Sequence, residues 1–237
     1  MNAFFFTEHL DADPVLLKRI AAFNTQALGF SREESAALSR LIPDERMCAA
    51  AARFPEIKAE LLKLARQKGL LTVRRLEEAY WDFTEPSTRL ALLPPEVLSR
   101  LGRLAAAALL GSQAAKTVVK PQVESLKKAL GEDIYAYALL RGRYQAGALV
   151  ADAVYLVPAG LQLGTQCLVL ARVLLEIVRR SWPDTLQRLS GASFAGLDLP
   201  IPESLPETTP ELNRRIWHFL KKLILRELDS EWLPYFS

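Results

Sequence analysis

The sequence has few of the residues on which metal and nucleophilic chemistry usually depend. Its 237 residues include only two cysteines and two histidines. Cys48 and Cys167 lie far apart and form no CxxC pair, so a reducing cytoplasm fits the chain better than an oxidising compartment. His9 and His218 are too few for a transition-metal site or for the base of a catalytic triad. We therefore expect a protein that is not an enzyme and that has no metal and no cofactor.

Other signatures of catalysis are also missing. The chain has neither a GxxxxGK[ST] loop nor a GxGxxG loop, both of which bind phosphates. Neighbouring acidic residues do occur, but adjacent carboxylates on a helix point in different directions. Three of the four pairs stand where a helix is expected to begin, where acidic side chains complement the helix dipole. The pairs are Asp11/Asp13, Glu33/Glu34, Glu77/Glu78 and Glu132/Asp133.

Long hydrophobic runs are absent as well. The apolar segment at residues 1–6 is too short for a signal peptide and has no basic residues before it. The longest apolar stretch, residues 146–178, is interrupted by Asp152, Pro158, Arg172 and Glu176. No uninterrupted span of roughly 20 apolar residues remains, which is the length that a membrane helix needs. We expect contact with a membrane only through partner proteins.

Charge of one sign is not concentrated anywhere, since the net charge is only +3. This balance argues against a nucleic-acid-binding tail, and no nucleic acid partner is expected. One alternative stays open, because residues 58–81 are typical of two helices joined at a glycine, loosely like a helix-turn-helix. Basic residues occur there among acidic ones, so a helical DNA-binding regulator is the second hypothesis.

What the chain does contain in abundance is leucine and alanine, and glycine is sparse at 11 residues. This composition favours helices. We predict an all-α, compact, bundle-like protein. Residues 150–157 are the one place where a short strand is considered.

The N-terminal third predicts several helices separated by proline and glycine. Pro14 opens the first, which ends near Gly29, and Ser31 with Glu34 resembles a capping box for the second. A third helix covers residues 44–68 with a break or a kink at Pro55, and a fourth starts at residue 71 and reaches Tyr80. The stretch 82–93 has no clear period. It predicts two sub-domains, 1–85 and 86–237, although one continuous domain is also compatible with the pattern.

The rest of the chain predicts helices at residues 94–111, 121–130, from 131 onwards, 166–180 and 210–228. The helix at 166–180 is apolar on nearly every side, which is typical of the middle of a bundle. Residues 191–210 are rich in proline, glycine, serine and threonine, and predict a long extended connector before the C-terminal helix.

The C-terminal helix and the tail after it supply the candidate interface residues. An apolar arc of Leu212, Ile216, Leu220, Leu223 and Ile224 is opposed by a basic arc of Arg214, Arg215, His218, Lys222 and Arg226, with Lys221 at its edge. The basic arc is either a solvated face or an electrostatic contact with an acidic protein surface. The tail residues Trp232, Tyr235 and Phe236 either form an interface or fold back onto the bundle.

The order of motifs in residues 90–236 resembles a known family. The residues that carry the resemblance are Leu92-Leu93-Pro94-Pro95-Glu96-Val97-Leu98, Ala129-Leu130-Gly131-Glu132-Asp133-Ile134-Tyr135-Ala136-Tyr137-Ala138-Leu139, the apolar run from Gly164 to Leu175, Leu197-Asp198-Leu199-Pro200 and the closing basic helix with Trp232. In order and spacing they are similar to the K-subunit family of the type III secretion apparatus (SctK, YscK, OrgA-like).

This resemblance implies a function that composition and periodicity do not supply. Members of that family are cytoplasmic, non-catalytic adaptors of the sorting platform and use no cofactor. They link the cytoplasmic domain of the inner-membrane ring protein (SctD-like) to the pod protein (SctQ-like). The resemblance therefore implies a protein of virulence-associated protein transport, located in the cytoplasm at the periphery of the inner-membrane apparatus. The candidate contact residues remain Arg214, Arg215, Lys222, Arg226, Trp232, Tyr235 and Phe236.

Overall fold

A computed structural model describes residues 14–27, 30–42, 44, 46–48, 54–70, 79–153, 155–158 and 160–236. Within these ranges the regular structure is helical and contains no β-strand, so the predicted all-α class is confirmed. The chain divides into two compact units, Met1–Asp82 and Phe83–Ser237. The division lies close to residue 85, where the loss of hydrophobic periodicity led us to place it.

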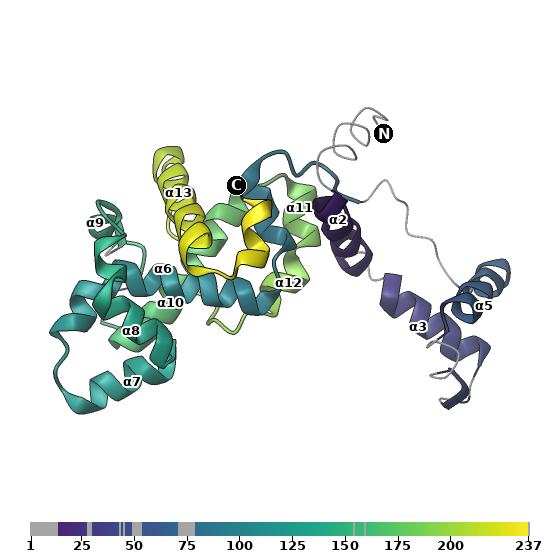
Figure 1. Ribbon diagram of the computed structural model, residues 1–237, viewed down its shortest axis with the longest axis horizontal. Helices are drawn as coiled ribbons and strands as arrows, with labels where there is room; N and C mark the ends of the chain where they lie inside the picture. Colours follow the sequence, from purple (N-terminus) through teal and green to yellow (C-terminus); the bar gives the residue numbers. More distant parts are fainter. Residues whose placement is uncertain are drawn as a thin grey trace. The chain divides into compact units, whose positions relative to one another are not determined.

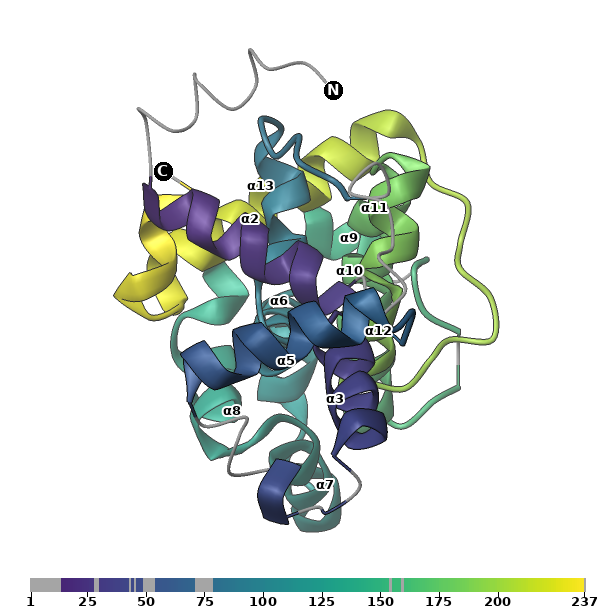
Figure 2. The same cartoon turned by 90° about the vertical axis from the view of Figure 1, so that its right-hand side faces the viewer.

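The first unit contains α2 (Pro14–Ala27), α3 (Phe30–Leu41) and α5 (Pro55–Gln67). Helix α3 packs against both α2 and α5, and the three are seen from a second side in Figure 2. Pro14 begins α2 as predicted, because the missing N–H of proline is not needed in the first helical turn. The predicted capping box is wrong, since α3 begins at Phe30 and Ser31 lies inside it.

Helix α5 shows how proline and glycine delimit a helix. Pro55 begins the helix, so of the two predicted alternatives, a break and a kink, the structure shows the break. Gly69 ends it with a φ of 65°, a left-handed conformation that glycine adopts without a steric penalty. The N–H of Leu70 then donates to the carbonyl of Ala65 at 2.9 Å, as in a Schellman motif. The helix expected after Gly69 falls on residues 71–78, which lie outside the described residues, and Tyr80 is not helical.

A buried asparagine closes this first unit. The amide of Asn24 donates to the carbonyl of Tyr80 at 2.8 Å and accepts from the N–H of the same residue at 2.9 Å. This two-way pairing satisfies both polar ends of a side chain that is 3% exposed. It fastens the last segment of the unit to α2.

The second unit contains most of the helices, which we list in chain order. They are η2 (Pro86–Leu92), α6 (Pro95–Lys116), α7 (Lys120–Leu130), α8 (Glu132–Leu140), η3 (Gly142–Tyr144), α9 (Leu149–Ala153), α10 (Leu163–Arg180), α11 (Asp184–Leu189), α12 (Gly191–Ala195), α13 (Pro210–Glu227) and η4 (Ser230–Tyr235).

Helices α6 and α10 form the centre of this unit. They lie side by side along its length, and α7 and α8 pack around one of their ends (Figure 1). Helix α10 also contacts α7 and α13. Its apolar residues are buried on almost every side, among them Leu170, Leu174 and Leu175. The sequence placed this helix in the middle of a bundle, and that prediction is confirmed.

Gly111 does not end α6 as the sequence suggested, because the helix continues to Lys116. A Cβ at this position would lie 2.9 Å from the carbonyl oxygen of Ala138 and 3.0 Å from the Cβ of Arg143. The glycine is therefore a contact point at which α8 and η3 approach the backbone of α6. The segment considered as a strand begins instead with the helical turns of α9.

The expected connector at residues 191–210 is only partly extended. Two short helices were not predicted: α11 precedes the connector, and α12 occupies its first five residues. Residues 200–209 contain no helix. Leu197 and Leu199 are buried, so the connector is anchored to the unit at its beginning.

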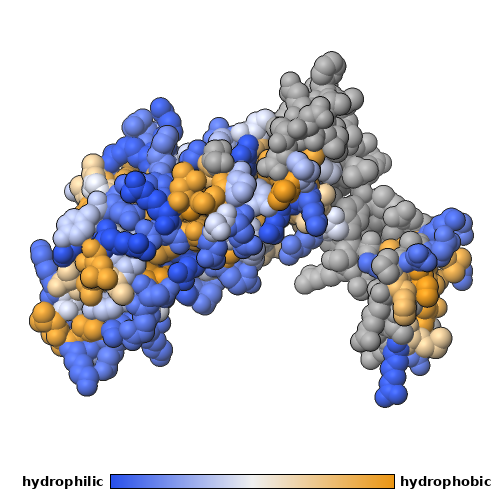
Figure 3. All heavy atoms as spheres, viewed as in Figure 1, coloured by the Kyte–Doolittle hydropathy of each residue, from blue (hydrophilic) through white to orange (hydrophobic). Residues whose placement is uncertain are grey.

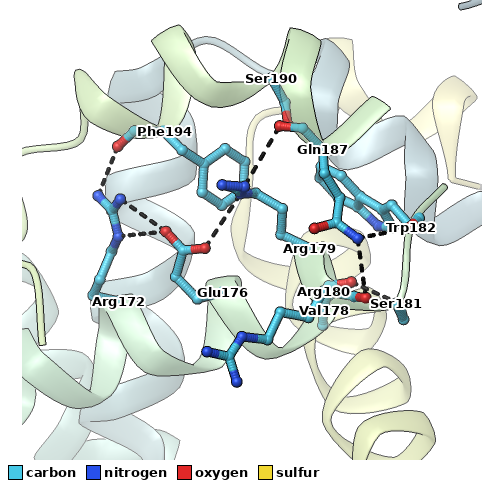
Figure 4. Close-up of polar contacts among 10 residues, drawn as sticks. All are labelled: Arg172, Glu176, Val178, Arg179, Arg180, Ser181, Trp182, Gln187, Ser190 and Phe194. Atoms are coloured by element: carbon cyan, nitrogen blue, oxygen red, sulfur yellow. Dashed lines mark hydrogen bonds and ion pairs between the residues drawn. The ribbon is translucent and has the colours of Figure 1, made fainter. Parts of the chain in front are cut away.

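A polar cluster holds α11 and α12 against α10 (Figure 4). Arg172 is 4% exposed and donates to the carbonyl of Phe194 at 2.6 Å, and it forms an ion pair of 2.8 Å with Glu176. Arg179 pairs with the other oxygen of Glu176 at 3.2 Å and lies over the ring of Phe194. A buried charge is tolerable only when it is paired in this way. Trp182 packs against the same phenyl ring of Phe194 in a T-shaped contact.

In the described ranges, none of the helices combines the length and the apolar character needed to cross a membrane.

Candidate protein-binding surface

Helix α13 carries the residues that the sequence marked for binding, and its local signals position it well. Thr209 caps it by accepting a hydrogen bond from the N–H of Leu212 at 3.2 Å, and Pro210 takes the first helical position. The predicted apolar arc packs into the second unit, with Ile216, Leu220, Leu223 and Ile224 buried together with Phe219. The opposite side of the helix contributes a largely hydrophilic surface in Figure 3.

Four residues of the predicted basic arc form two pairs with different surroundings. Arg214 and Arg226 are exposed, and the side chain of Arg214 retains 71% of its accessible surface. Its nearest acid is Glu211 at 3.6 Å on the same helix, a pair that is worth little because water screens it. These two arginines are available to a partner.

Arg215 and Lys222 instead hold the unit together. Arg215 forms an ion pair of 2.8 Å with Asp152 of α9. Lys222 donates to the backbone carbonyl of Gln145 at 3.3 Å. The sequence suggested either a solvated face or a contact with an acidic partner for these residues, and neither alternative included these contacts within the chain. Their partners lie more than 60 residues away in the chain, so helical periodicity alone could not identify them.

Glu227 completes this internal set of polar contacts. It is paired with Arg141 at 2.7 Å, and it accepts a hydrogen bond from Gln145 at 3.1 Å. The carboxylate is nearly buried, with a side chain 5% exposed. Burial, together with the negative charge of Glu227, raises the pKa of Tyr137, which therefore stays a neutral hydrogen-bonding group.

The aromatic tail adopts the folded-back arrangement of the two that the sequence allowed. Trp232 is 4% exposed, Tyr235 5% and Phe236 0%. The ring of Phe236 lies against Trp217, with 6.3 Å between the ring centroids. Arg89 donates to the carbonyl of Tyr235 at 2.9 Å and fixes the backbone of the tail. As they stand, these aromatic residues belong to the core and do not offer an open contact surface.

A groove with a volume of about 840 Å³ lies beside α13. The helix contributes Pro210, Asn213, Arg214, Trp217, His218 and Lys221, and the facing wall contains Glu85, Pro86, Ser87, Val178 and Ser181. Sequence reasoning missed this groove, although its wall on α13 follows the helical spacing i, i+3, i+4, i+7, i+8, i+11. The second wall comes from η2 and from the end of α10, which no local pattern brings to α13.

The remaining titratable pairs on the surface have ordinary structural partners. Asp133 forms an ion pair of 2.7 Å with Arg100, whose hydrogen bond holds the pKa of that carboxyl below its usual value. Glu132 pairs with Lys127 at 3.1 Å. Both acids stand in the first turn of α8, as the dipole argument predicted. They stabilise the start of a helix and show no catalytic arrangement.

The described ranges offer no cluster of side chains suited to metal binding and no reactive thiol in the second unit. These contain no group of three or more His, Cys, Asp and Glu side chains that could hold a metal ion. Cys167 is buried, and burial raises the pKa of its thiol to about 12. His218 is exposed and its Nδ1 contacts the carbonyl of Arg214 at 2.8 Å, whereas His9 lies outside the described residues. The second helix of the considered helix-turn-helix also lies outside them.

No protein-family model, no curated protein and no solved structure matches the chain.

Proposed function

We propose that the protein is a non-catalytic adaptor of a type III secretion sorting platform. In this role it links the cytoplasmic domain of the inner-membrane ring protein to the pod protein of the platform. It acts in the cytoplasm, reaches the membrane only through these partners, and needs no cofactor. The identity of the partners comes from the resemblance of residues 90–236 to the K-subunit family.

The observation that carries the proposal is that the residues resembling the family all lie within one folded unit. The stretch that resembles the family, residues 90–236, falls within the compact unit Phe83–Ser237. The motifs that make up the resemblance therefore belong to a single packed body of helices. The run at Leu92–Leu98 leads into α6, the run at Ala129–Leu139 covers the junction of α7 and α8, and the apolar run lies in α10. Helices α6 and α10 form the centre of the unit, and α7 and α8 pack around one of their ends.

The exposed charges on α13 support a role in binding. An adaptor needs charged groups that are free to meet a partner while the helix that carries them stays fixed. The apolar side of α13 is buried, and Arg215 and Lys222 tie it to neighbouring segments. Arg214 and Arg226 then project from a rigid support, which reduces the ordering cost of binding.

The test is an affinity pull-down of the tagged full-length protein from type III-secreting cells, read by mass spectrometry. We expect the ring protein and the pod protein to be recovered. Reversing the two exposed charges in R214E/R226E should reduce the recovery of one of them without unfolding the protein. The matched variant K116E/K128E reverses two exposed charges on other helices and should recover both partners. If the folded, abundant wild-type protein recovers neither partner, the proposal is wrong.

A further inference from the structure

We infer that the groove beside α13 binds an acidic, extended peptide segment of a partner protein, with carboxylates at Arg214 and Lys221 and an apolar side chain against Trp217. This inference concerns the chemistry of the groove itself. It holds for any partner that presents such a segment, whether or not the partner belongs to a secretion apparatus.

The basic groups that line the groove are spaced along one side of a helix. Arg214, His218 and Lys221 follow one another at intervals of four and three residues, so their heads form a row parallel to the axis of α13. From Arg214 to Lys221 the helix rises by about 10 Å, at roughly 1.5 Å per residue. An extended chain covers that distance in about three residues. Acidic residues a few positions apart on one peptide therefore reach both ends of the row.

The balance of charge in the groove favours an anionic occupant. Its lining includes the two permanent cations Arg214 and Lys221 and the single acid Glu85. No carboxylate closer than 3.6 Å to Arg214 is found in the described part of the second unit, and its Glu211 pair is exposed and weak. Arg214 can therefore exchange this contact for one with a partner.

The rest of the lining is apolar and suits a side chain of the peptide. Pro86, Val178 and Pro210 lie around the half-exposed Trp217. The ring of Trp217 is held in place from behind by Phe236. A rigid aromatic surface of this kind provides contact area at low entropic cost, and such residues dominate the energy of many interfaces. An apolar anchor between two acidic residues would fill this part of the groove.

The groove thus offers cations for carboxylates and an aromatic surface for an apolar side chain. Asn213 also lines it, but its Oδ1 atom is buried and therefore not exposed to an occupant.

A peptide accounts for these features better than a nucleic acid does. Duplex DNA is bound mainly through many phosphate contacts distributed along a basic surface. Here the cations are few, Glu85 stands on the opposite wall, and the middle of the groove is apolar. Neither the acidic residue nor the apolar middle of the groove improves contact with a phosphate backbone. Duplex DNA and anionic lipid vesicles are therefore competitors whose binding would contradict the inference.

The experiment uses the purified full-length protein and a fluorescein-labelled short peptide in which Asp and Glu flank a central Phe-Leu pair. Binding is followed by fluorescence anisotropy at moderate ionic strength. We expect saturable binding, a clear loss when the acids are replaced by Asn and Gln, and a loss of about tenfold or more in affinity for R214E/K221E. The matched variant K116E/K128E should bind within about twofold of wild type, because its reversed charges lie outside the groove. Circular dichroism shows that each variant is folded.

A second measurement locates the peptide. In a two-dimensional NMR titration the indole N–H signal of Trp217, assigned with Trp217→Phe, should shift as the peptide is added, whereas that of buried Trp182 should not. The inference is overturned if the amide peptide binds equally well, if R214E/K221E binds as wild type does, or if duplex DNA or anionic vesicles bind more tightly than the acidic peptide. These readouts use purified protein alone, so their failure is distinct from a failure of the pull-down that tests the proposed adaptor.

Discussion

Arg172 and Phe194 are joined by a hydrogen bond of 2.6 Å from the guanidinium Nη1 of the arginine to the backbone carbonyl of the phenylalanine. The two residues are 22 positions apart, on α10 and α12. The bond belongs to the cluster in which Glu176 pairs with both Arg172 and Arg179. It explains how a five-residue helix persists, since a helix of that length is not stable by itself.

Neutralising Glu176 should therefore destabilise the second unit. In E176Q two arginines lose their common counter-charge, and one of them is almost completely buried. Removing one partner of a buried ion pair typically costs about 3 kcal/mol. Urea denaturation followed by circular dichroism measures the loss. R180M is the matched control, because Arg180 is exposed and its side chain takes no part in the cluster in Figure 4; it should change stability by less than about 0.5 kcal/mol. Equal effects of the two substitutions would refute a stabilising role for the cluster.

Gly111 should show the reverse of the usual effect of alanine in a helix. Alanine normally stabilises a helix interior by about 1 kcal/mol relative to glycine. At position 111, however, its Cβ would collide with the backbone of Ala138. We expect G111A to cost about 1–3 kcal/mol in chemical denaturation, as over-packing does. In G191A, by contrast, the added Cβ meets no atom within 4 Å, and stability should be unchanged or slightly higher. A stabilised G111A would mean that α8 and η3 lie farther from α6.

Replacing Phe236 in the tail with alanine tests whether this residue belongs to the core or to an interface. Phe236 is fully buried and contacts Trp217. F236A should therefore cost about 3–5 kcal/mol in the free energy of unfolding. R226A, on the exposed side of α13, should stay within about 0.5 kcal/mol of wild type. If F236A is as stable as wild type and affects only partner binding, the tail is an interface element after all.

The two cysteines should differ in reactivity. Cys167 is 1% exposed and burial raises its thiol pKa to about 12, so at pH 8 roughly one molecule in 10⁴ carries the reactive thiolate there. Cys48 is half-buried. In native protein treated with iodoacetamide at pH 8, peptide mass spectrometry should find Cys48 modified well before Cys167. In urea both should react at similar rates. Rapid labelling of native Cys167 would show that α10 opens readily.

Features with a local cause were predictable from the sequence. Pro14 and the Thr209-Pro210 pair mark helix starts because the first turn needs no N–H from proline, and Gly69 ends a helix because it tolerates a positive φ. The apolar arc of α13 followed from its period alone. Each of these signals acts within a few residues, so it can be recognised in the sequence without knowledge of the rest of the fold.

Features that depend on distant partners were not predictable. The sequence around Gly111 does not indicate that the carbonyl of Ala138 will lie against this glycine. Arg215 reads as a surface residue until α9 brings Asp152 to it. The short helices α11 and α12 need the Arg172 cluster. In the groove, the stripe from Pro210 to Lys221 can be recognised in the sequence, but the opposite wall at Pro86 and Val178 cannot.

Arg89 gives the second unit one more property. Its Nε atom donates to the carbonyl of Phe83 and its Nη1 atom to that of Tyr235, both at 2.9 Å. One side chain thus holds the first and the last segments of this unit next to each other. A short linker between these two ends, with a new opening at the exposed residues 203 and 204, would give a circularly permuted second unit that keeps its described helices next to the same neighbours. Tension applied to the ends would be borne by this arginine together with the buried side chains of Phe83 and Phe236 before it reached the central helices.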